Sequence, residues 1–232
     1  MVFGGFGDSV AAPECATFKL PDSLSFADGA LVEPMACGLH ALRLAGIIRG
    51  RTILVLGSGS IALSTIFWAR HLEAKRIVVS SRSGLRREMA MGLGADAFHS
   101  LQDDDPEALD RLLSEPPDIA AECVGKPDSL QRAVERVRPG GTVLSMGMCT
   151  VPDRVVPALG DFKEIRLLFP LAYSVAEYVE TMRVFDAGGI NPALIVSEVI
   201  PLDALPPMLD AMRLGQSHLK VHVDPALENE NA

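Results

Sequence analysis

The sequence predicts an α/β fold built on a doubly wound parallel sheet with helices on both faces. Three observations lead to this expectation. Short runs of β-branched and other apolar residues alternate with stretches of helical spacing. The runs are apolar throughout, which is typical of strands buried on both faces of a parallel sheet. Glycine and proline separate the segments at the spacing of repeated strand–helix units.

The central part of the chain supplies the strands and helices of this sheet in alternation. We expect strands at 52–56, 76–80, 96–99, 118–123, 142–146 and 165–169. Helices are expected at 61–72, 85–94, 106–114 and 127–137. Proline opens the last two helices, where its missing N–H removes no helical hydrogen bond, and glycine ends the second helix. The crossovers should be right-handed.

Both ends of the chain depart from this alternation. Residues 1–26 are rich in glycine and proline and suggest an edge strand and a linker. After residue 174 we expect a helix at 175–187, a strand at 195–199, a helix at 202–214 and a strand at 219–223. The sequence thus predicts a central domain at 27–173, between a first segment at 1–26 and a last segment at 174–232.

Composition narrows the classes of function. The 232 residues include 30 acidic and 21 basic side chains, a formal net charge of −9, which argues against a nucleic-acid binder that neutralises phosphates. Hydrophobic residues make up 48%, enough for a large core. The uncharged stretch 53–69 is too short to span a membrane. No secretory leader is evident and the four cysteines are widely spaced, which together favour a cytoplasmic protein.

A glycine-rich loop joins the first expected strand to its helix. The G-x-G-x-x-A pattern consists of Gly57, Ser58, Gly59, Ser60, Ile61 and Ala62. The first glycine allows a tight turn, the second lets backbone approach a pyrophosphate, and the helix N-terminus attracts the phosphates. In this strand–helix context the pattern predicts a dinucleotide-binding Rossmann fold. A tight turn without a ligand is the alternative.

The end of the second expected strand indicates which dinucleotide binds. NAD-binding proteins place a carboxylate there to hold the ribose hydroxyls. This chain instead has Ser81, Arg82, Arg86 and Arg87, with no carboxylate between residues 79 and 87. Hydroxyl and guanidinium groups would bind a 2′-phosphate that a carboxylate would repel. We therefore expect NADP(H) to be favoured over NAD(H). The alternative is that Arg86 and Arg87 merely solvate the start of the next helix.

Further motifs give the chain a family resemblance. In order they are GGF at 4–6, LPDSLSF at 20–26, LVEP at 31–34, HAL at 40–42, the glycine-rich loop, GAD at 94–96, ECVG at 122–125 and RPGG at 138–141. Together they resemble the zinc-type medium-chain dehydrogenase/reductases, especially the sorbitol and threonine dehydrogenase-like branch. The resemblance implies an oxidoreductase that transfers a hydride between a nicotinamide and an alcohol or carbonyl carbon.

The resemblance also implies a zinc site that this chain carries only in part. Members of the family have an N-terminal GroES-like catalytic domain that supplies a cysteine and a histidine to zinc, whereas here only remnants of that domain are expected, at both ends. Of the zinc residues, the resemblance implies Glu33 alone. Cys37 and His40 suggest a local site, or belong to a helix packed on the nucleotide domain. Pro34 disfavours helical geometry at Glu33, so we expect the three side chains not to converge and zinc to be substoichiometric.

Two more strand ends are implied as cofactor contacts by the resemblance. Cys123, Val124 and Gly125 follow the fourth expected strand, and the fifth ends at Met146, Gly147 and Met148. Folds of this kind bind ligands at the carboxyl ends of parallel strands. A core of small residues is the alternative. The loop at 169–173 resembles the one that approaches the nicotinamide carboxamide.

These observations lead to an NADP(H)-dependent oxidoreductase, zinc-type alcohol dehydrogenase-like and N-terminally shortened, with a small-molecule alcohol or carbonyl substrate. The alternative is a non-catalytic NADP(H)-binding module that senses or scaffolds. A methyltransferase-like fold is less favoured, because its cofactor usually requires an acid where this chain has arginines. The resemblance further implies a homodimer through an edge strand at 154–159, which contains Val155 and Val156. No catalytic residue is predicted.

Overall fold

The computed structural model describes residues 5–7, 9–103, 105, 107–191, 194–214 and 218–227. The chain divides into two compact units, residues 32–181 and residues 1–31 with 182–232. We call them the sheet unit and the terminal unit and describe each by itself. The domain boundaries expected after residues 26 and 173, and the origin of the terminal unit in a second domain, stay predictions. None of the described helices is long and apolar enough to cross a bilayer.

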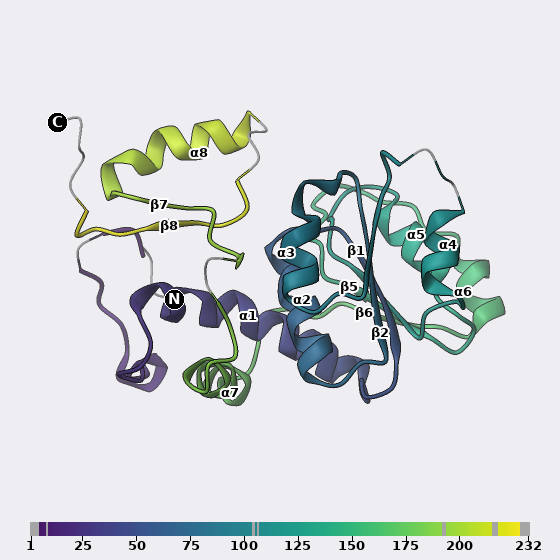
Figure 1. Cartoon of the computed structure of the whole chain (residues 1–232), viewed down its shortest axis with the longest axis horizontal. Coiled ribbons are helices and arrows are strands. Elements are labelled where there is room, and N and C mark those ends of the chain that lie inside the picture. Colours follow the sequence, from purple (N-terminus) through teal and green to yellow (C-terminus); the bar gives the residue numbers. More distant parts are fainter. Residues whose placement is uncertain are drawn as a thin grey trace. The chain divides into compact units, whose positions relative to one another are not determined.

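A six-stranded parallel sheet forms the centre of the sheet unit (Figure 1). Its strands lie in the order β3-β2-β1-β4-β5-β6. Their bounds are β1 Thr52–Leu56, β2 Arg76–Ser81, β3 Ala97–Ser100, β4 Ile119–Glu122, β5 Thr142–Ser145 and β6 Arg166–Leu168. In register, Ile53 of β1 lies opposite Ile77 of β2 and Ile119 of β4. The strand order reverses beside β1, so the predicted doubly wound α/β fold is confirmed.

Helices cover both faces of this sheet. Figure 1 shows α2 (Ser60–His71) and α3 (Arg87–Gly92) on one side, with α4 (Ala108–Leu113), α5 (Ser129–Arg136) and α6 (Pro157–Lys163) on the other. On the second side, Leu109, Leu113 and Val134 pack with the strand residues Leu54 and Val143 in one buried cluster. Because both faces are covered, the strands are apolar throughout. The helix predicted at 85–94 begins with a 3-10 turn, η2 (Gly84–Arg86).

A long helix precedes the first strand. α1 runs from Phe26 to Ala45 and contains Pro34, so the expectation that Pro34 would exclude helical geometry at Glu33 is wrong. Proline removes one N–H donor from a helix but does not prevent the chain from continuing when other contacts hold it. Here most of the helix after Pro34 is buried, with Met35 and Leu39 almost fully covered.

The contacts that hold this part of α1 come from α2. The Met35 carbonyl oxygen accepts hydrogen bonds from Ser64 Oγ at 3.0 Å and from Trp68 Nε1 at 2.7 Å. A Cβ on Gly38 would overlap Ser64, so glycine is needed for the two helices to approach this closely. Tertiary packing and hydrogen bonds with buried side chains of α2 therefore keep the chain helical past Pro34, although proline itself disfavours a helix.

The segment after β5 differs from the predicted edge strand. Residues 154–156 form no regular element, and 157–159 begin α6 with Pro157 in its first turn. Proline is favoured at that position because its missing N–H breaks no helical bond. Val155 and Leu159 pack against the core cluster. The edge strand at 154–159 is thus wrong, and the terminal strand of the described sheet on this side is β6.

The terminal unit contains two parallel strands, β7 (Glu198–Ile200) and β8 (Val221–Val223). η4 (Leu202–Ala204) and α8 (Leu205–Arg213) lie between them, and α7 (Val175–Asp186) enters the unit from the sheet unit. These elements have the predicted types, with β7 starting later than expected. In residues 5–7 and 9–25 the structure has the 3-10 helix η1 (Glu14–Ala16) and no strand. The edge strand predicted within 1–26 is therefore wrong for these residues, where Pro13 and Pro21 cannot donate to a sheet.

Candidate cofactor-binding site

The glycine-rich loop forms the tight turn between β1 and α2. Gly57 has a φ of +107°, a conformation that favours glycine, and its N–H donates to the Ser80 carbonyl oxygen at 2.8 Å. A Cβ at Gly57 would lie 3.2 Å from the Cys123 carbonyl oxygen. α2 begins at Ser60 with Gly59 as its N-cap, and no side chain caps its first turn. The open N–H groups of this turn are those that attract phosphate.

Ser58, Ser81 and Arg86 meet beside this turn. Ser58 Oγ lies 2.8 Å from Ser81 Oγ, and Arg86 Nη1 donates to the Ser58 carbonyl oxygen at 3.4 Å. Burial lowers the pKa of Arg86 from its usual value. Arg82 is exposed and forms no hydrogen bond or ion pair among the residues that the structure describes. Two hydroxyls and a guanidinium group from separate segments are thus brought together.

Arg87 has a different role. Its Nη1 donates to the Phe98 carbonyl oxygen at 2.9 Å, and its guanidinium carbon lies 5.1 Å from the centre of the Phe98 ring. Its Nη2 lies 3.6 Å from Asp103 Oδ2. Arg87 therefore packs the start of α3 against β3 and the loop that follows, so it does more than solvate the start of the helix.

Sequence reasoning missed the role of Glu122, which closes β4. Its side chain is 2% exposed, and Oε1 accepts hydrogen bonds from the Val124 N–H at 2.6 Å and the Gly125 N–H at 2.9 Å. Its carbonyl oxygen accepts from the N–H groups of Met146 at 2.8 Å and Gly147 at 2.9 Å. Glu122 thus fastens the loop after β4 to the loop after β5. The sequence signal for this role was a carboxylate at the end of an apolar strand. Residue spacing could not reveal its partner, because the loop after β5 lies too far along the chain.

Two glycines allow these loops to touch. A Cβ on Gly147 would overlap the Gly125 nitrogen and lie 2.6 Å from Glu122 Oε2. Gly125 itself has a φ of +68°, and a Cβ there would lie 2.8 Å from the Met148 nitrogen. Larger residues at either position would force the loops apart.

Below these loops, Thr65 of α2 contacts two sulfur atoms. Its Oγ1 lies 3.4 Å from Met146 Sδ and 3.9 Å from Cys123 Sγ, and the two sulfurs are 4.0 Å apart. Burial raises the pKa of Cys123 to about 12, a hydrogen bond with Thr65 opposes this shift, and the charge of Glu122 adds to it. The Cys123 thiol is therefore protonated at neutral pH and is not a nucleophile.

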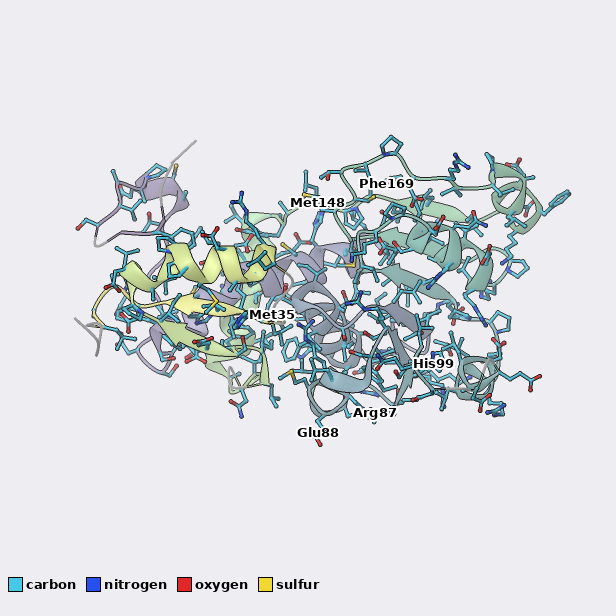
Figure 2. All side chains as sticks on the ribbon, turned by 90° about the horizontal axis from the view of Figure 1, so that it is seen from above. Met35, Arg87, Glu88, His99, Met148 and Phe169 are labelled. Carbon is cyan, nitrogen blue, oxygen red and sulfur yellow. The ribbon has the colours of Figure 1, made fainter. Side chains whose placement is uncertain are left out.

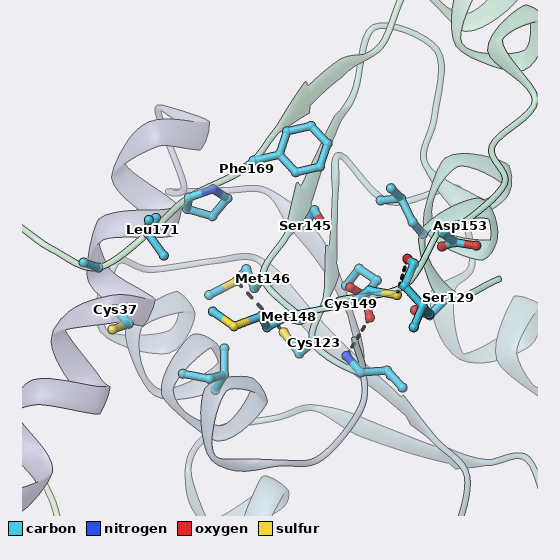
Figure 3. Close-up of a pocket in the computed structure, with 18 residues that line it drawn as sticks. Cys37, Cys123, Ser129, Ser145, Met146, Met148, Cys149, Asp153, Phe169 and Leu171 are labelled. Atoms are coloured by element: carbon cyan, nitrogen blue, oxygen red, sulfur yellow. Dashed lines mark hydrogen bonds between the residues drawn. The ribbon is translucent and has the colours of Figure 1, made fainter. Parts of the chain in front are cut away.

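A cavity of about 690 Å³ opens at the carboxyl ends of β4, β5 and β6 (Figure 3). This volume lies in the range of small-molecule sites. Its wall includes the predicted cofactor residues Ile61, Cys123, Val124, Met146, Gly147 and Met148. Figure 2 shows Met148 and Phe169 on the opposite side of the sheet unit from Arg87 and His99. The serine–arginine group, defined as Ser58, Ser81 and Arg86, follows β1 and β2, whereas the cavity follows β4, β5 and β6, so the two lie at different points along the carboxyl edge of the sheet.

Glu33 and Cys37 lie one turn apart on α1. Cys37 Sγ is 4.0 Å from Glu33 Oε1 and 3.6 Å from the Glu33 carbonyl oxygen. His40 pairs instead with Glu177 of α7, with 3.0 Å between Nδ1 and Oε2. In the described parts of the chain, no group of three or more His, Cys, Asp or Glu side chains is placed to hold a metal. These residues do not fit a catalytic zinc, which needs about three protein ligands.

Glu33 has a partner of another kind. Tyr173, which follows the cavity wall, lies near the Glu33 carboxylate, whose negative charge acts on the Tyr173 hydroxyl. Burial, followed by the negative charge of Glu33, raises the pKa of Tyr173 to about 12. The Tyr173 ring also lies 5.7 Å from the ring of Tyr178. The carboxylate that the resemblance assigns to zinc thus lies near a tyrosine hydroxyl in this chain.

Residues 60–187 match the protein-family model described as zinc-binding dehydrogenase. The chain belongs to this zinc-binding dehydrogenase family. The resemblance to zinc-type medium-chain dehydrogenases is therefore confirmed, and the matched segment contains α2, the strands β2 to β6 and α7.

Named relatives of the chain support this family membership. Sorbitol dehydrogenase of Ovis aries is 35% identical over 227 residues, which are 91% of this chain and 61% of that protein. A protein described as a zinc-binding dehydrogenase from Sinorhizobium meliloti 1021, bound to NADP, is 29% identical with a TM-score of 0.81 and covers 90% of this chain and 62% of its own. For 2R,3R-butanediol dehydrogenase of Bacillus subtilis the identity is 28%, the TM-score 0.79 and the coverages 90% and 60%. The chain spans about three-fifths of the length of these relatives.

Proposed function

We propose that this chain binds NADP(H) along the carboxyl edge of its sheet, as part of an oxidoreductase that acts on a small-molecule alcohol or carbonyl compound. When bound, the nicotinamide supplies the hydride donor or acceptor. The chain holds and orients it: the turn from Gly57 to Ser60 receives the pyrophosphate, and the loops after β4 and β5 contact the nicotinamide half. Family membership supports the dehydrogenase chemistry, and the NADP-bound relative supports the cofactor.

The group of Ser58, Ser81 and Arg86 carries this proposal. The two hydroxyls, 2.8 Å apart, and the half-buried guanidinium can all donate to a phosphate. Arg82 adds an exposed positive charge beside them. No carboxylate stands between residues 79 and 87 to accept the ribose hydroxyls of NAD. A 2′-phosphate is the group of the dinucleotide that matches this chemistry.

The backbone beside α2 also fits a dinucleotide. A Cβ at Gly59 would meet no atom within 4 Å, so the space beside the helix N-terminus is open. The α2 N–H groups in its first turn point toward this space and have no side-chain cap. A pyrophosphate placed there would receive these hydrogen bonds and the favourable helix dipole.

Fluorescence titration with NADPH and NADH tests the proposal. We expect NADPH to bind at least about tenfold more tightly, a difference of roughly 1.4 kcal/mol. Ser81→Asp should reverse the preference, because it places a carboxylate beside the 2′-phosphate. Ser114→Asp is the matched control: it adds the same charge after α4, before the start of β4, at the other edge of the sheet. Equal affinities of the unaltered chain for the two cofactors would contradict the proposal.

This proposal assigns no residue of the chain to the zinc ion that the family binds. A zinc ion would polarise the substrate oxygen, but His40 is paired with Glu177, and the described residues bring no three metal-binding side chains together. These observations favour a second candidate function, a non-catalytic NADP(H)-binding module. Turnover of any alcohol or carbonyl compound by the purified chain would exclude that module, while tight NADPH binding without turnover would favour it.

The proposal also covers how copies of the chain associate and in which compartment the protein lies. β6 is the terminal strand of the described sheet, and a terminal strand can pair with its counterpart in a second copy. We therefore propose a homodimer. None of the four cysteines forms a disulfide, which supports a reducing compartment such as the cytoplasm.

A further inference from the structure

The loop between β6 and α7 forms part of the cavity wall. Residues 169–172 of this loop all line the cavity (Figure 3). Phe169 and Leu171 are exposed by 68% and 76%, so little packing holds the loop in place. Ala172 has a φ of +58°, a left-handed conformation that costs free energy in a residue other than glycine. Such a conformation persists where neighbouring contacts impose it, so the loop needs an anchor.

The anchor lies at the start of α7, where Ser174 and Glu177 form a capping box. Glu177 Oε2 accepts hydrogen bonds from the Ser174 N–H at 2.7 Å and from the Ser174 hydroxyl at 2.8 Å. In return, the Glu177 N–H donates to Ser174 Oγ at 3.3 Å. This motif fixes the residue at which the chain passes from the loop into the helix. Because its contacts are local, a further contact is needed to hold it to the rest of the sheet unit.

His40 of α1 supplies that contact. Its Nδ1 lies 3.0 Å from Glu177 Oε2, the same oxygen that Ser174 binds. Burial alone would raise the pKa of Glu177, but hydrogen bonds from Ser174 and His40 lower it below its ordinary value. The buried group is therefore a carboxylate, which can only accept hydrogen bonds, so Nδ1 of His40 carries the hydrogen. This bond fastens the capping box to α1, the helix that also supplies Cys37 to the cavity wall.

We propose that His40 is a positioning residue for the nicotinamide half of the cofactor. Through Glu177 and Ser174 it holds the loop at 169–173 in the arrangement that receives the nicotinamide. The inference rests on the proposed function, which gives this cavity to the nicotinamide half. Without the bond to His40, the loop adopts that arrangement for only part of the time, and the apparent affinity for the complete dinucleotide falls by that fraction. The serine–arginine group, which follows other strands, keeps its affinity for the 2′-phosphate.

His40→Leu tests this inference with two ligands, NADPH and 2′,5′-ADP, whose binding to the complete chain is measured by titration calorimetry. 2′,5′-ADP carries the 2′-phosphate but no nicotinamide, so it does not reach the loop. We expect His40→Leu to weaken NADPH binding about tenfold, the effect of losing one hydrogen bond to a charged group. The affinity for 2′,5′-ADP should stay unchanged, which also shows that the variant is folded.

A conservative variant separates positioning from packing. In His40→Asn the side-chain amide can take the place of Nδ1 and donate to Glu177, so most of the lost NADPH affinity should return. The fluorescence of bound NADPH gives a second readout, because its emission responds to enclosure of the nicotinamide. The emission shift on binding should be smaller in His40→Leu and restored in His40→Asn.

Arg43→Leu is the matched control. Arg43 lies one turn after His40 on α1, and its Nη2 donates to the carboxylate oxygens of Glu180 on α7 at 2.7 and 2.6 Å. The variant therefore removes the neighbouring ion pair between the same two helices and leaves the capping box intact. The affinities for NADPH and for 2′,5′-ADP should both stay unchanged.

The outcomes separate this inference from the proposed function. If the unaltered chain does not bind NADPH, the proposed function fails and the inference fails with it. If NADPH binds but His40→Leu leaves its affinity unchanged, or weakens both ligands equally, the inference alone is overturned. It is likewise overturned if Arg43→Leu weakens NADPH binding as much as His40→Leu, or if His40→Asn restores nothing.

Discussion

The turn between β1 and α2 and the joined loops after β4 and β5 lie on the same edge of one sheet, yet they are built differently. The turn is local: Gly57 and Gly59 are two residues apart, and their conformations follow from their own sequence. The joined loops depend on Glu122, whose oxygens hold backbone groups of two segments 20 or more residues apart. The difference teaches that a ligand site can combine a part readable from a short motif with a part that only folding assembles.

Glycine-to-alanine variants should distinguish the local turn from the joined loops with the largest effect on stability. Gly147→Ala would drive a Cβ into the Gly125 nitrogen and Glu122 Oε2, so we expect a loss of about 3 kcal/mol in the free energy of unfolding. Gly59→Ala meets no atom within 4 Å and should cost less than about 1 kcal/mol, while weakening NADPH binding. Urea unfolding and NADPH titration of both variants measure the contrast. Equal stability losses would show that the two regions do not differ in this way.

Glu122 gives the next largest effect. Glu122→Ala removes the acceptor of two buried backbone N–H groups and should destabilise the chain by about 2 kcal/mol. Glu122→Gln keeps an acceptor oxygen and should cost distinctly less. Chemical denaturation of the two variants checks this order. If Glu122→Gln is as unstable as Glu122→Ala, the loops are not held by these hydrogen bonds.

A smaller, pH-dependent effect on the free energy of unfolding should come from Cys123. Its pKa is raised from 9.0 to about 12 in the folded chain, chiefly by burial. In the unfolded chain the thiol ionises near its ordinary pKa, so its contribution to stability is complete below pH 9 and is lost as pH rises toward 12. Urea unfolding at pH 8 and pH 10 should show a decline that is reduced in Cys123→Ala. An unchanged decline in that variant would show that other groups cause it.

Particular residues show how much of the structure could be predicted from the sequence alone. Strand β1 was predicted with its observed bounds, and the fold class is confirmed, because apolar runs and turn residues are local signals. The helical course through Pro34 was not predictable, because it depends on Ser64 and Trp68 of another helix. The helix at 157–159 replaced a predicted edge strand for a similar reason, since Leu159 packs on the core. Of the predicted cofactor residues, Ser58, Ser81 and Arg86 are found together, while their role stays a prediction.

The smallest expected effect concerns zinc. The described residues bring no three metal-binding side chains together and His40 is paired with Glu177, so the purified chain should hold well under one zinc per molecule. Glu33→Ala should leave both the zinc content and NADPH affinity unchanged. Elemental analysis after gel filtration decides the point. One tightly held zinc per chain that is lost in Glu33→Ala would mean that a metal centre exists here.

The central claim is that the serine–arginine group beside the glycine turn recognises a 2′-phosphate. Calorimetric titration with 2′,5′-ADP and with 5′-AMP tests it most directly, because these fragments differ only in that phosphate and do not reach the cavity. The account predicts that 2′,5′-ADP binds at least about tenfold more tightly to the unaltered chain, and that Arg86→Gln removes most of this difference. Equal binding of the two fragments, or an undiminished difference in Arg86→Gln, would contradict it.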